Sequence, residues 1–461
     1  MSSSTKPPTT TSSSTSKKEA KKRTPKQMAT ECKKWVAAEL ATIAPERRRP
    51  PASGSPYDPQ DVAAAKRTID HTFRVGCKAS VVVFRDGRCA AIKKIDTGPV
   101  VDQAVAAQLR EKGIDPDRHR VLQCIVKKYE APADPIPPEY LPFLRAIAPA
   151  VTDGAHMFVL SDMPLLRADG RHPWPMVYRT QAERDAIVTP PPSPAARYIP
   201  VYNSFSMDGY LDIAVPTYDD LAVAARTRFR RPVAPASKPW AERKPVALFR
   251  GSSTGCGTTA RTNPRLALAE LSAAGTVAGL DAGITAFGKA PRFDPETGVG
   301  WIRSERATQA SYVPPGDAQL YKYNVHVEGN VAAFRLANMM RAGCLQLIVD
   351  SPYRLWYERL MTVGRLFDHD DPPRRKKAAA VDTTGWHAIA IRRDLSDIGP
   401  TLKWCMAHDA ECEAIAARGA AFAWSIASLG GFTPHTPDQG AAAPGPRQNA
   451  SKKSAAVQRV L

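Results

Sequence analysis

The segment from Lys244 to Arg265 constrains the fold of this chain most strongly. A short apolar run over residues 246–249 leads into a loop rich in Gly, Ser and Thr, as when a buried strand delivers a loop to the edge of a sheet. Glycines let backbone N–H groups approach an anion closely, and hydroxyls and an arginine add donors. The loop therefore predicts an anion site, although an ordinary strand-to-helix turn uses the same residue types. The candidate anion-binding residues are Arg250, Gly251, Ser252, Ser253 and Thr254.

The second half of the chain alternates between strand and helix patterns. Apolar runs predict strands at residues 246–249, near 300, at 345–349 and at 387–391. Helical patterns begin at about Pro264, cover residues 330–342 and follow Asp394. Such alternation is typical of a parallel α/β sheet.

The first half carries a hairpin signal and one clear helix pattern. Strand patterns at residues 81–84 and 89–95 flank Asp86-Gly87, a dipeptide that favours tight hairpin turns. Residues 139–148 predict a helix and residues 156–160 a short strand. Four prolines between residues 232 and 245 predict the boundary between two α/β halves that face each other across a cleft.

Composition predicts a tail at each end. Residues 1–50 hold twelve Lys or Arg and four Asp or Glu, so they contribute +8 of the net charge of +19. We expect a disordered basic tail over residues 1–50, an N-terminal half over 60–232, a C-terminal half over 238–432 and a disordered Ala/Pro tail over 433–461. The basic tail is suited to weak contact with nucleic acid or another acidic surface, and equally to solubilising the chain.

Several classes of protein are disfavoured by the sequence. No apolar stretch reaches the ~18 residues of a membrane span, and no secretory signal pattern is found, so we expect a cytoplasmic location. The eight cysteines include no C-x-x-C pair and the nine histidines no zinc spacing, so we expect no metal site. Asp368-His369-Asp370 has the form D-x-D, but it lies in a predicted charged loop and we attribute it to chance.

A second candidate anion site follows the strand pattern that contains Tyr323. Gly329 and Asn330 precede the helix predicted at 330–342, with Asn330 as its N-cap and Arg335 away from its apolar face. A helix N-terminus preceded by glycine favours phosphate because free N–H groups and the helix dipole point at the ligand. A capped surface helix with Arg335 in a salt bridge fits the same pattern.

Asp162 is the strongest candidate for a general base. It follows the apolar residues 156–160, and open α/β sheets place their ligands at the carboxyl ends of strands. A turn-capping role before Met163-Pro164 is the alternative. Asp212 is a further candidate for the substrate side of the cleft, although a surface turn accounts for it equally well.

Six segments, in order, resemble glycosyltransferase family 90, which includes capsule- and lipopolysaccharide-modifying proteins and protein O-glucosyltransferases. The resemblance covers about residues 150–425. Its blocks are residues 158–164, residues 200–216, Phe249 to Gly255 (an FRGS-x-T core), residues 280–284, Lys322 to Arg335, and residues 386–419.

The resemblance implies a GT-B fold of two Rossmann-like halves, with the donor on the C-terminal half and the acceptor on the N-terminal half. It implies an inverting, metal-independent transfer from a UDP-sugar, a co-substrate that carries glucose or xylose, to a hydroxyl on a glycan or protein. Asp162 takes the role of base, Arg250 and Arg335 hold the diphosphate, and Ser206 and Asp212 contact the acceptor. No other cofactor is expected.

Two departures from the family pattern affect these assignments. Ala333 replaces the usual serine, which removes one hydroxyl, and residues 256–263 are extra, which leaves open which arginine reaches the nucleotide. The Ala, Arg and Pro content is compatible with a GC-rich genome such as that of a large DNA virus, in which case the location is the host cytoplasm or the virion. The alternative function is a catalytically degenerate glycosyltransferase fold that acts as a basic virion or nucleic-acid-associated binding protein.

Overall fold

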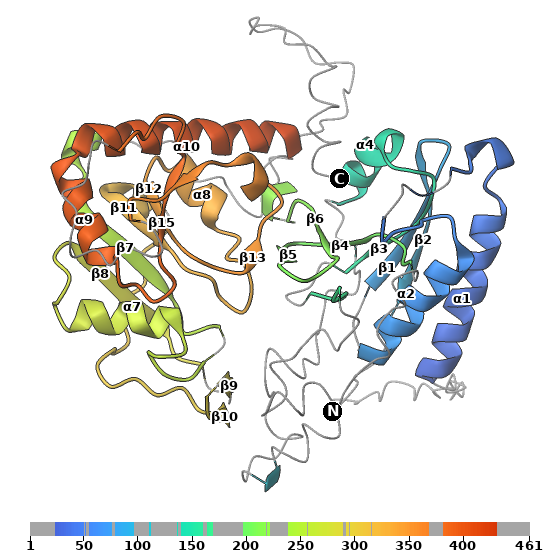
Figure 1. The fold of residues 1–461 in the computed structure, drawn as a ribbon, viewed down its shortest axis with the longest axis horizontal. Coiled ribbons are helices and arrows are strands. Elements are labelled where there is room, and N and C mark those ends of the chain that lie inside the picture. The colour runs from blue at the N-terminus through green and yellow to red at the C-terminus, as the bar shows by residue number, and fades with distance from the viewer. Residues whose placement is uncertain are drawn as a thin grey trace, which may run out of the picture.

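The computed structural model describes residues 24–49, 51, 55–75, 79–95, 110–111, 136, 140–159, 164–168, 197–217, 219–221, 238–255, 257–288, 292–294, 296–314, 316–367 and 381–430. Within these residues the protein is mixed α/β, with two large sheets that each have their own hydrophobic core (Figure 1). The expected tail at residues 433–461, the predicted base Asp162 and the D-x-D sequence at 368–370 lie outside them.

The first sheet has five strands in the order β2-β1-β3-β4-β6. Strand β1 is antiparallel to β2 and β3, whereas β3, β4 and β6 run parallel. The expected Rossmann-like sheet is therefore wrong for β1 and β2, because the turn between them has positive φ at Asp86 and Gly87 and forces a hairpin. The strands are β1 (Ala79–Arg85), β2 (Arg88–Ile95), β3 (Gly154–Phe158), β4 (Val201–Asn203) and β6 (Ile213–Ala214).

Helices cover both faces of this sheet because its strands are apolar on both sides. Val81 and Val83 of β1 face helices α1 (Pro25–Ala41) and α2 (Val62–Val75). The alternate residues Val82 and Phe84 face helix α4 (Tyr140–Ile147), as the period of two along a strand requires. Short 3-10 helices follow α1 and α4: η1 (Pro45–Arg47) and η2 (Ala148–Ala150).

Helix α1 corrects the expectation of a disordered tail over residues 1–50. Thr24 caps the helix with a capping box, and Pro25 occupies its first turn. Cys32, Val36 and Leu40 lie on one face at helical spacing and are buried in the core of the first sheet. Residues 24–49 are therefore part of the first α/β unit, because this apolar stripe supplies enough burial to hold a basic segment in place.

The second sheet has six strands in the order β14-β15-β12-β11-β7-β8, and every neighbouring pair is parallel. This confirms the parallel α/β sheet expected for the second half. Its first strand begins at Lys244, inside the predicted boundary of residues 232–245, so the last of the four prolines, Pro245, belongs to the strand. The strands are β7 (Lys244–Ser252), β8 (Leu280–Ala286), β11 (Tyr321–His326), β12 (Leu345–Val349), β14 (Val363–Gly364) and β15 (Ala388–Ile391).

Among the described residues, four α-helices complete this half. Helix α7 (Pro264–Ala273) begins where expected, with Asn263 as its N-cap, and packs with α9 (Ile398–Ala407) and α10 (Asp409–Gly430) around one core of the sheet. Helix α8 (Leu336–Arg341) covers the opposite side, where Met339 meets Leu248. The part of the chain that the structure describes also contains the 3-10 helices η4 (Trp240–Glu242), η5 (Asp317–Leu320) and η6 (Glu358–Leu360).

One expectation about this half is wrong in detail. Of the helix predicted over residues 330–342, only α8 forms. Residues 331–335 do not continue this helix, so Asn330 is not its N-cap. The strand predicted near residue 300 is confirmed as β10 (Gly298–Gly300), which pairs with β9 (Arg292–Asp294) in a separate antiparallel ladder.

A small ladder joins the two halves. Strand β5 (Ser206–Met207) comes from the first half and pairs with β13 (Tyr353–Arg354) from the second, between the two large sheets (Figure 1). The edge-on contact between Phe205 and Tyr353 lies beside it. Trp356 also donates to Asp220 across the same boundary at 3.1 Å. No helix among the described residues is long and apolar enough to cross a membrane.

Leu40→Ala should lower the free energy of unfolding by about 2–5 kcal/mol, the usual range when a buried leucine is truncated. Leu40 is 2% exposed against the first sheet. Urea unfolding followed by circular dichroism measures the change, with the exposed Lys34→Ala on the same helix as the matched control. Equal stability of the two variants would mean that α1 is a detached tail.

Candidate donor site

The second sheet changes direction next to β7. From β7 the chain crosses to β8 on one side, and it later returns to β11 on the other side. Open α/β sheets bind ligands at such a switch point, outside the carboxyl ends of the strands. The two segments that leave β7 and β11 at this point are residues 251–255 and 327–335, which contain both predicted anion sites.

The structure brings these two segments into contact. The Gly255 backbone N–H donates to Asn330 Oδ1 at 3.1 Å. A Cβ at Gly255 would lie 3.1 Å from the Gly329 carbonyl oxygen, and one at Gly329 would lie 3.1 Å from Thr254 Oγ1. Gly255 also has a φ of +116°, a backbone conformation that residues with a side chain rarely adopt. The glycines are therefore needed for close approach, and the two predicted sites are one.

Arg265 fixes the two segments to each other. Its guanidinium donates to the Ser252 carbonyl at 2.9 Å and to Thr254 Oγ1 at 2.5 Å. It also donates to the carbonyls of Val327 at 3.1 Å and Glu328 at 2.6 Å. The residue is only 4% exposed. Arg265 thus positions the site, a role that the sequence left undecided.

Arg335 is the accessible arginine of the site. Its Nη1 donates to the Arg250 carbonyl at 2.6 Å, and its guanidinium lies 5.9 Å from the centre of the Phe249 ring. A Cβ at Gly251 would lie 3.1 Å from Arg335 Nη2 and 3.4 Å from Arg265 Nη1, so both cations converge over this glycine. The surrounding protein lowers the pKa of Arg335 by desolvation, and Tyr312 opposes that effect. A hollow of about 210 Å³ lies between Arg335 and Arg265.

The guanidinium of Arg250 contacts β7, β8 and Ser311. Its Nη2 pairs with Asp281 Oδ1 at 2.8 Å, and its other N–H groups reach the carbonyls of Phe249, Asp281 and Ser311. The guanidinium therefore ties β7 to β8. Whether it also reaches a diphosphate stays a prediction.

The other predicted donor-site residues differ in what they contact. The Ser253 hydroxyl accepts from the Gly288 N–H at 2.9 Å, and the Ser252 carbonyl accepts from Arg265. Tyr323 is fully buried, and its hydroxyl donates to the Cys405 carbonyl at 3.3 Å. Tyr323 therefore packs in the core of the sheet, away from residues 251–255.

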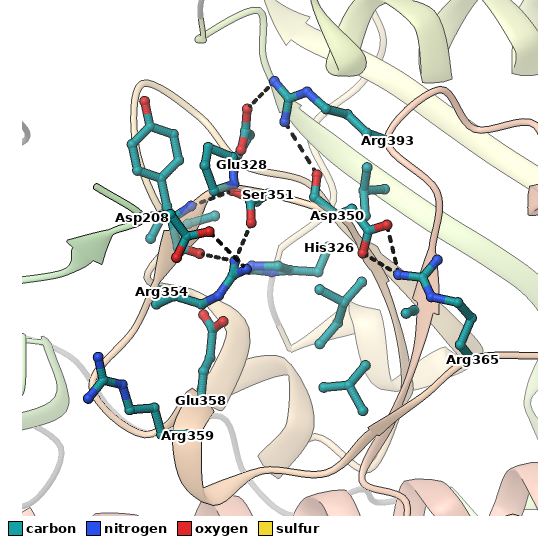
Figure 2. Close-up of a pocket in the computed structure, with 18 residues that line it drawn as sticks. Asp208, His326, Glu328, Asp350, Ser351, Arg354, Glu358, Arg359, Arg365 and Arg393 are labelled. Atoms are coloured by element: carbon teal, nitrogen blue, oxygen red, sulfur yellow. Dashed lines mark hydrogen bonds and ion pairs between the residues drawn. The ribbon is translucent and has the colours of Figure 1, made fainter. Parts of the chain in front are cut away.

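A larger pocket of about 710 Å³ opens at the carboxyl ends of β11, β12 and β15 (Figure 2). Acids and arginines alternate around it. Arg365 binds both oxygens of Asp350 at 2.7 Å, Arg393 binds Glu328 at 2.8 Å, and Arg354 lies 3.6 Å from Asp208 of the first half. Ala332 and Ala333 line both this pocket and the hollow beside Arg335. A ligand that extends from Arg335 can therefore continue into the larger pocket.

Glu358 and His326 also line the larger pocket. Burial raises the pKa of Glu358 to about 7, although the Leu355 N–H and Arg354 oppose the shift. Burial, together with the nearby charges of Arg335 and Arg265, lowers the pKa of His326 to about 3. His326 is therefore neutral at physiological pH, beside two arginines that remain charged.

In the first half of the chain, Asp212 binds the backbone. Oδ1 accepts from the Leu165 N–H and Oδ2 from the Leu166 N–H, both at 2.8 Å, and Asn203 Nδ2 lies 3.3 Å from Oδ1. Burial raises its pKa to about 6 despite these bonds. Asp212 therefore holds the segment that begins two residues after Asp162. Ser206 lies on β5, in register with Arg354.

Comparison with known proteins identifies the family of this region. Residues 140–367 match the family model described as Glycosyl transferase family 90. The chain carries a glycosyltransferase family 90 region. This confirms the resemblance and includes both segments at the switch point.

Viral proteins are among the relatives. The chain is 32% identical to uncharacterized protein 027R of Frog virus 3 (isolate Goorha) over 290 residues, which is 57% of this chain and 27% of the relative. It is 30% identical to uncharacterized protein 035R of Invertebrate iridescent virus 3 over 268 residues, 55% of this chain and 22% of the relative. The chain thus spans about a quarter of the length of these relatives.

Protein O-glucosyltransferases of animals are also among the relatives. The chain is 28% identical to protein O-glucosyltransferase 3 of Homo sapiens over 252 residues, 53% of this chain and 40% of that protein. Together with the family match, this supports a glycosyltransferase.

Asp212→Asn should lower the free energy of unfolding by about 1–3 kcal/mol. The substitution replaces one carboxylate oxygen with an NH₂ group, so one of the two backbone N–H groups loses its acceptor and faces another donor. Chemical unfolding measures the change. Asp208→Asn is the control, because Asp208 is exposed and its ion pair with Arg354 contributes little. Unchanged stability of Asp212→Asn would restore Asp212 as a substrate contact.

Proposed function

We propose that this chain transfers a sugar from a UDP-sugar to a hydroxyl of a protein or glycan, with inversion and without a metal ion. The observation that carries the proposal is the convergence of Arg265 and Arg335 over Gly251 at the switch point of a parallel sheet, inside a family 90 region. Glucose is the proposed sugar, since a relative is named a protein O-glucosyltransferase.

A diphosphate leaving group needs positive charge and N–H donors. Arg335 supplies an accessible cation, and the N–H groups of Thr254 and of residues 331–333 are the proposed further donors. Arg265 holds these segments in place and adds its charge from behind them. The nucleoside and the sugar extend from the diphosphate, one of them into the larger pocket of acids and arginines.

In the proposed reaction the acceptor oxygen attacks the anomeric carbon from the face opposite the diphosphate. The new carbon–oxygen bond forms as the bond to the diphosphate breaks, and the acceptor's proton passes to Asp162. The diphosphate leaves with the electron pair of the broken bond, where Arg335 offsets its charge. One displacement inverts the anomeric configuration. The proposed GT-B arrangement places the acceptor on the first half, with Ser206 near it and Asp212 holding the segment after Asp162.

UDP should raise the melting temperature of the protein in EDTA as much as in Mg²⁺. A hundredfold excess over the dissociation constant stabilises a binding-competent fold by about 2.7 kcal/mol. Arg335→Ala should weaken UDP binding by about 1.5–3 kcal/mol, the contribution of a charge-assisted hydrogen bond, without loss of the fold.

Differential scanning fluorimetry and calorimetry measure both effects. Arg306→Ala is the control, because Arg306 is an exposed arginine of the same half that lines neither pocket. Loss of the thermal shift in EDTA would contradict the proposal that the donor site works without a metal ion. Equal UDP affinity of both variants would exclude Arg335 from it.

Asp162→Asn should abolish sugar transfer and leave UDP affinity unchanged. The amide keeps the shape of the side chain but accepts no proton, and loss of a general base typically lowers the rate ~10²–10⁴-fold. Radiolabelled transfer to an acceptor panel measures the rate, and NMR of the product reads the anomeric configuration. Transfer near the wild-type rate, or retention of configuration, would contradict this role. A wild type that binds UDP and transfers nothing would instead indicate a binding protein with a glycosyltransferase fold.

A further inference from the structure

His326 lies where the two parts of the candidate site meet. It is the last residue of β11, and it lines the larger pocket. The next two carbonyls, of Val327 and Glu328, bind Arg265. Both Arg265 and Arg335 are close enough to act on its charge. Figure 2 shows its ring among the labelled polar side chains of the pocket.

The imidazole of His326 is buried with an unused polar atom. The residue is 7% exposed, and its Nδ1 has no hydrogen-bond partner among the described residues. Other buried histidines differ. His71 Nε2 lies 2.8 Å from the Leu165 carbonyl, and His156 uses both nitrogens, with Thr152 and Tyr202. Native proteins rarely leave such a group unpaired unless it has a functional role or binds something else.

The state of this imidazole favours a hydroxyl as its partner. Two permanent cations and burial keep the ring uncharged, so it offers one N–H donor and one nitrogen acceptor. A hydroxyl can donate or accept and therefore suits either tautomer. The charge of Arg335 acts on His326, and Ala332 and Ala333 line both the hollow beside Arg335 and the pocket that contains His326. A hydroxyl close to the diphosphate is therefore the group that can reach both residues.

We propose that His326 hydrogen-bonds a secondary hydroxyl next to the diphosphate of the donor, on either the ribose or the transferred sugar. The inference rests on the proposed function and adds to it a residue that recognises the donor through a neutral contact. His326 is thus a determinant of donor selectivity, separate from the arginines that hold charge.

His326→Phe provides the test, because it keeps a planar ring and removes the nitrogens. The variant should bind its donor about five- to tenfold more weakly, as expected for one lost hydrogen bond. Its melting temperature without ligand should be unchanged or higher, because a buried unpaired group has been removed. His156→Phe is the matched control: it breaks two internal contacts, so it should melt earlier and keep its donor affinity.

Calorimetry with UDP, 2′-deoxy-UDP, 3′-deoxy-UDP and UDP-glucose separates the two sources of the hydroxyl. If the ribose supplies it, wild type and His326→Phe differ for UDP and agree for one deoxynucleotide. If the sugar supplies it, they agree for UDP and differ for UDP-glucose. His326→Asn should recover most of the affinity, since its amide lies near the position of Nδ1. If His326→Phe fails to fold, His326→Leu replaces it in the comparison with His326→Asn.

Equal affinity of wild type and variant for all four ligands would overturn the role of His326 and leave the proposed function intact. The role of His326 would also be overturned if the melting temperature of His326→Phe fell as far as that of His156→Phe while its donor affinity stayed unchanged. A wild type that binds none of the ligands would overturn the proposed function, and the role of His326 with it.

Discussion

The candidate site depends on one buried cation, Arg265. Its four acceptors named above belong to two segments that are far apart in sequence, one after β7 and one after β11. All four acceptors are neutral oxygens. A buried guanidinium is unfavourable unless its donors are satisfied, so the fold is most stable when both segments take this one arrangement. The same interaction therefore orders the site and holds a guanidinium in it.

The glycines follow from this constraint. Gly251 has no side chain because Arg265 and Arg335 cross over it, and Gly255 and Gly329 have none because the two segments touch there. Sheet topology determines where the two segments meet. Because β8 and β11 flank β7, the segments that follow β7 and β11 meet at the carboxyl edge of the sheet. The larger pocket continues from that edge because β11, β12 and β15 all end on it.

Local patterns in the sequence predicted the elements whose causes are local. The hairpin at Asp86-Gly87, the start of α7 at Pro264 and the strand at 345–349 were all predicted, since turn residues, proline and apolar runs fix them. Helix α1 carried its own signal, an apolar residue every three or four positions from Cys32 to Leu40, which the basic composition hid. The start of α8 had no local signal. Asn330 has the character of an N-cap, but its side chain is used by Gly255, a contact that only the tertiary fold creates.

The roles of the arginines could not be predicted for the same reason. Arg250, Arg265 and Arg335 all stand near glycine-rich loops in the sequence, and residue type does not distinguish them. The fold does: Asp281 neutralises Arg250, backbone carbonyls bury Arg265, and Arg335 stays accessible. An anion that arrives at this edge thus meets the exposed guanidinium of Arg335, with the buried guanidinium of Arg265 behind it. Positioned cations of this kind offset the charge that develops on a leaving diphosphate. Two acids of the neighbouring pocket, Asp350 and Glu328, oppose this effect little, because each is paired with an arginine, Arg365 or Arg393. The bond of the proposed donor would therefore break beside Arg335, at the junction of the two segments.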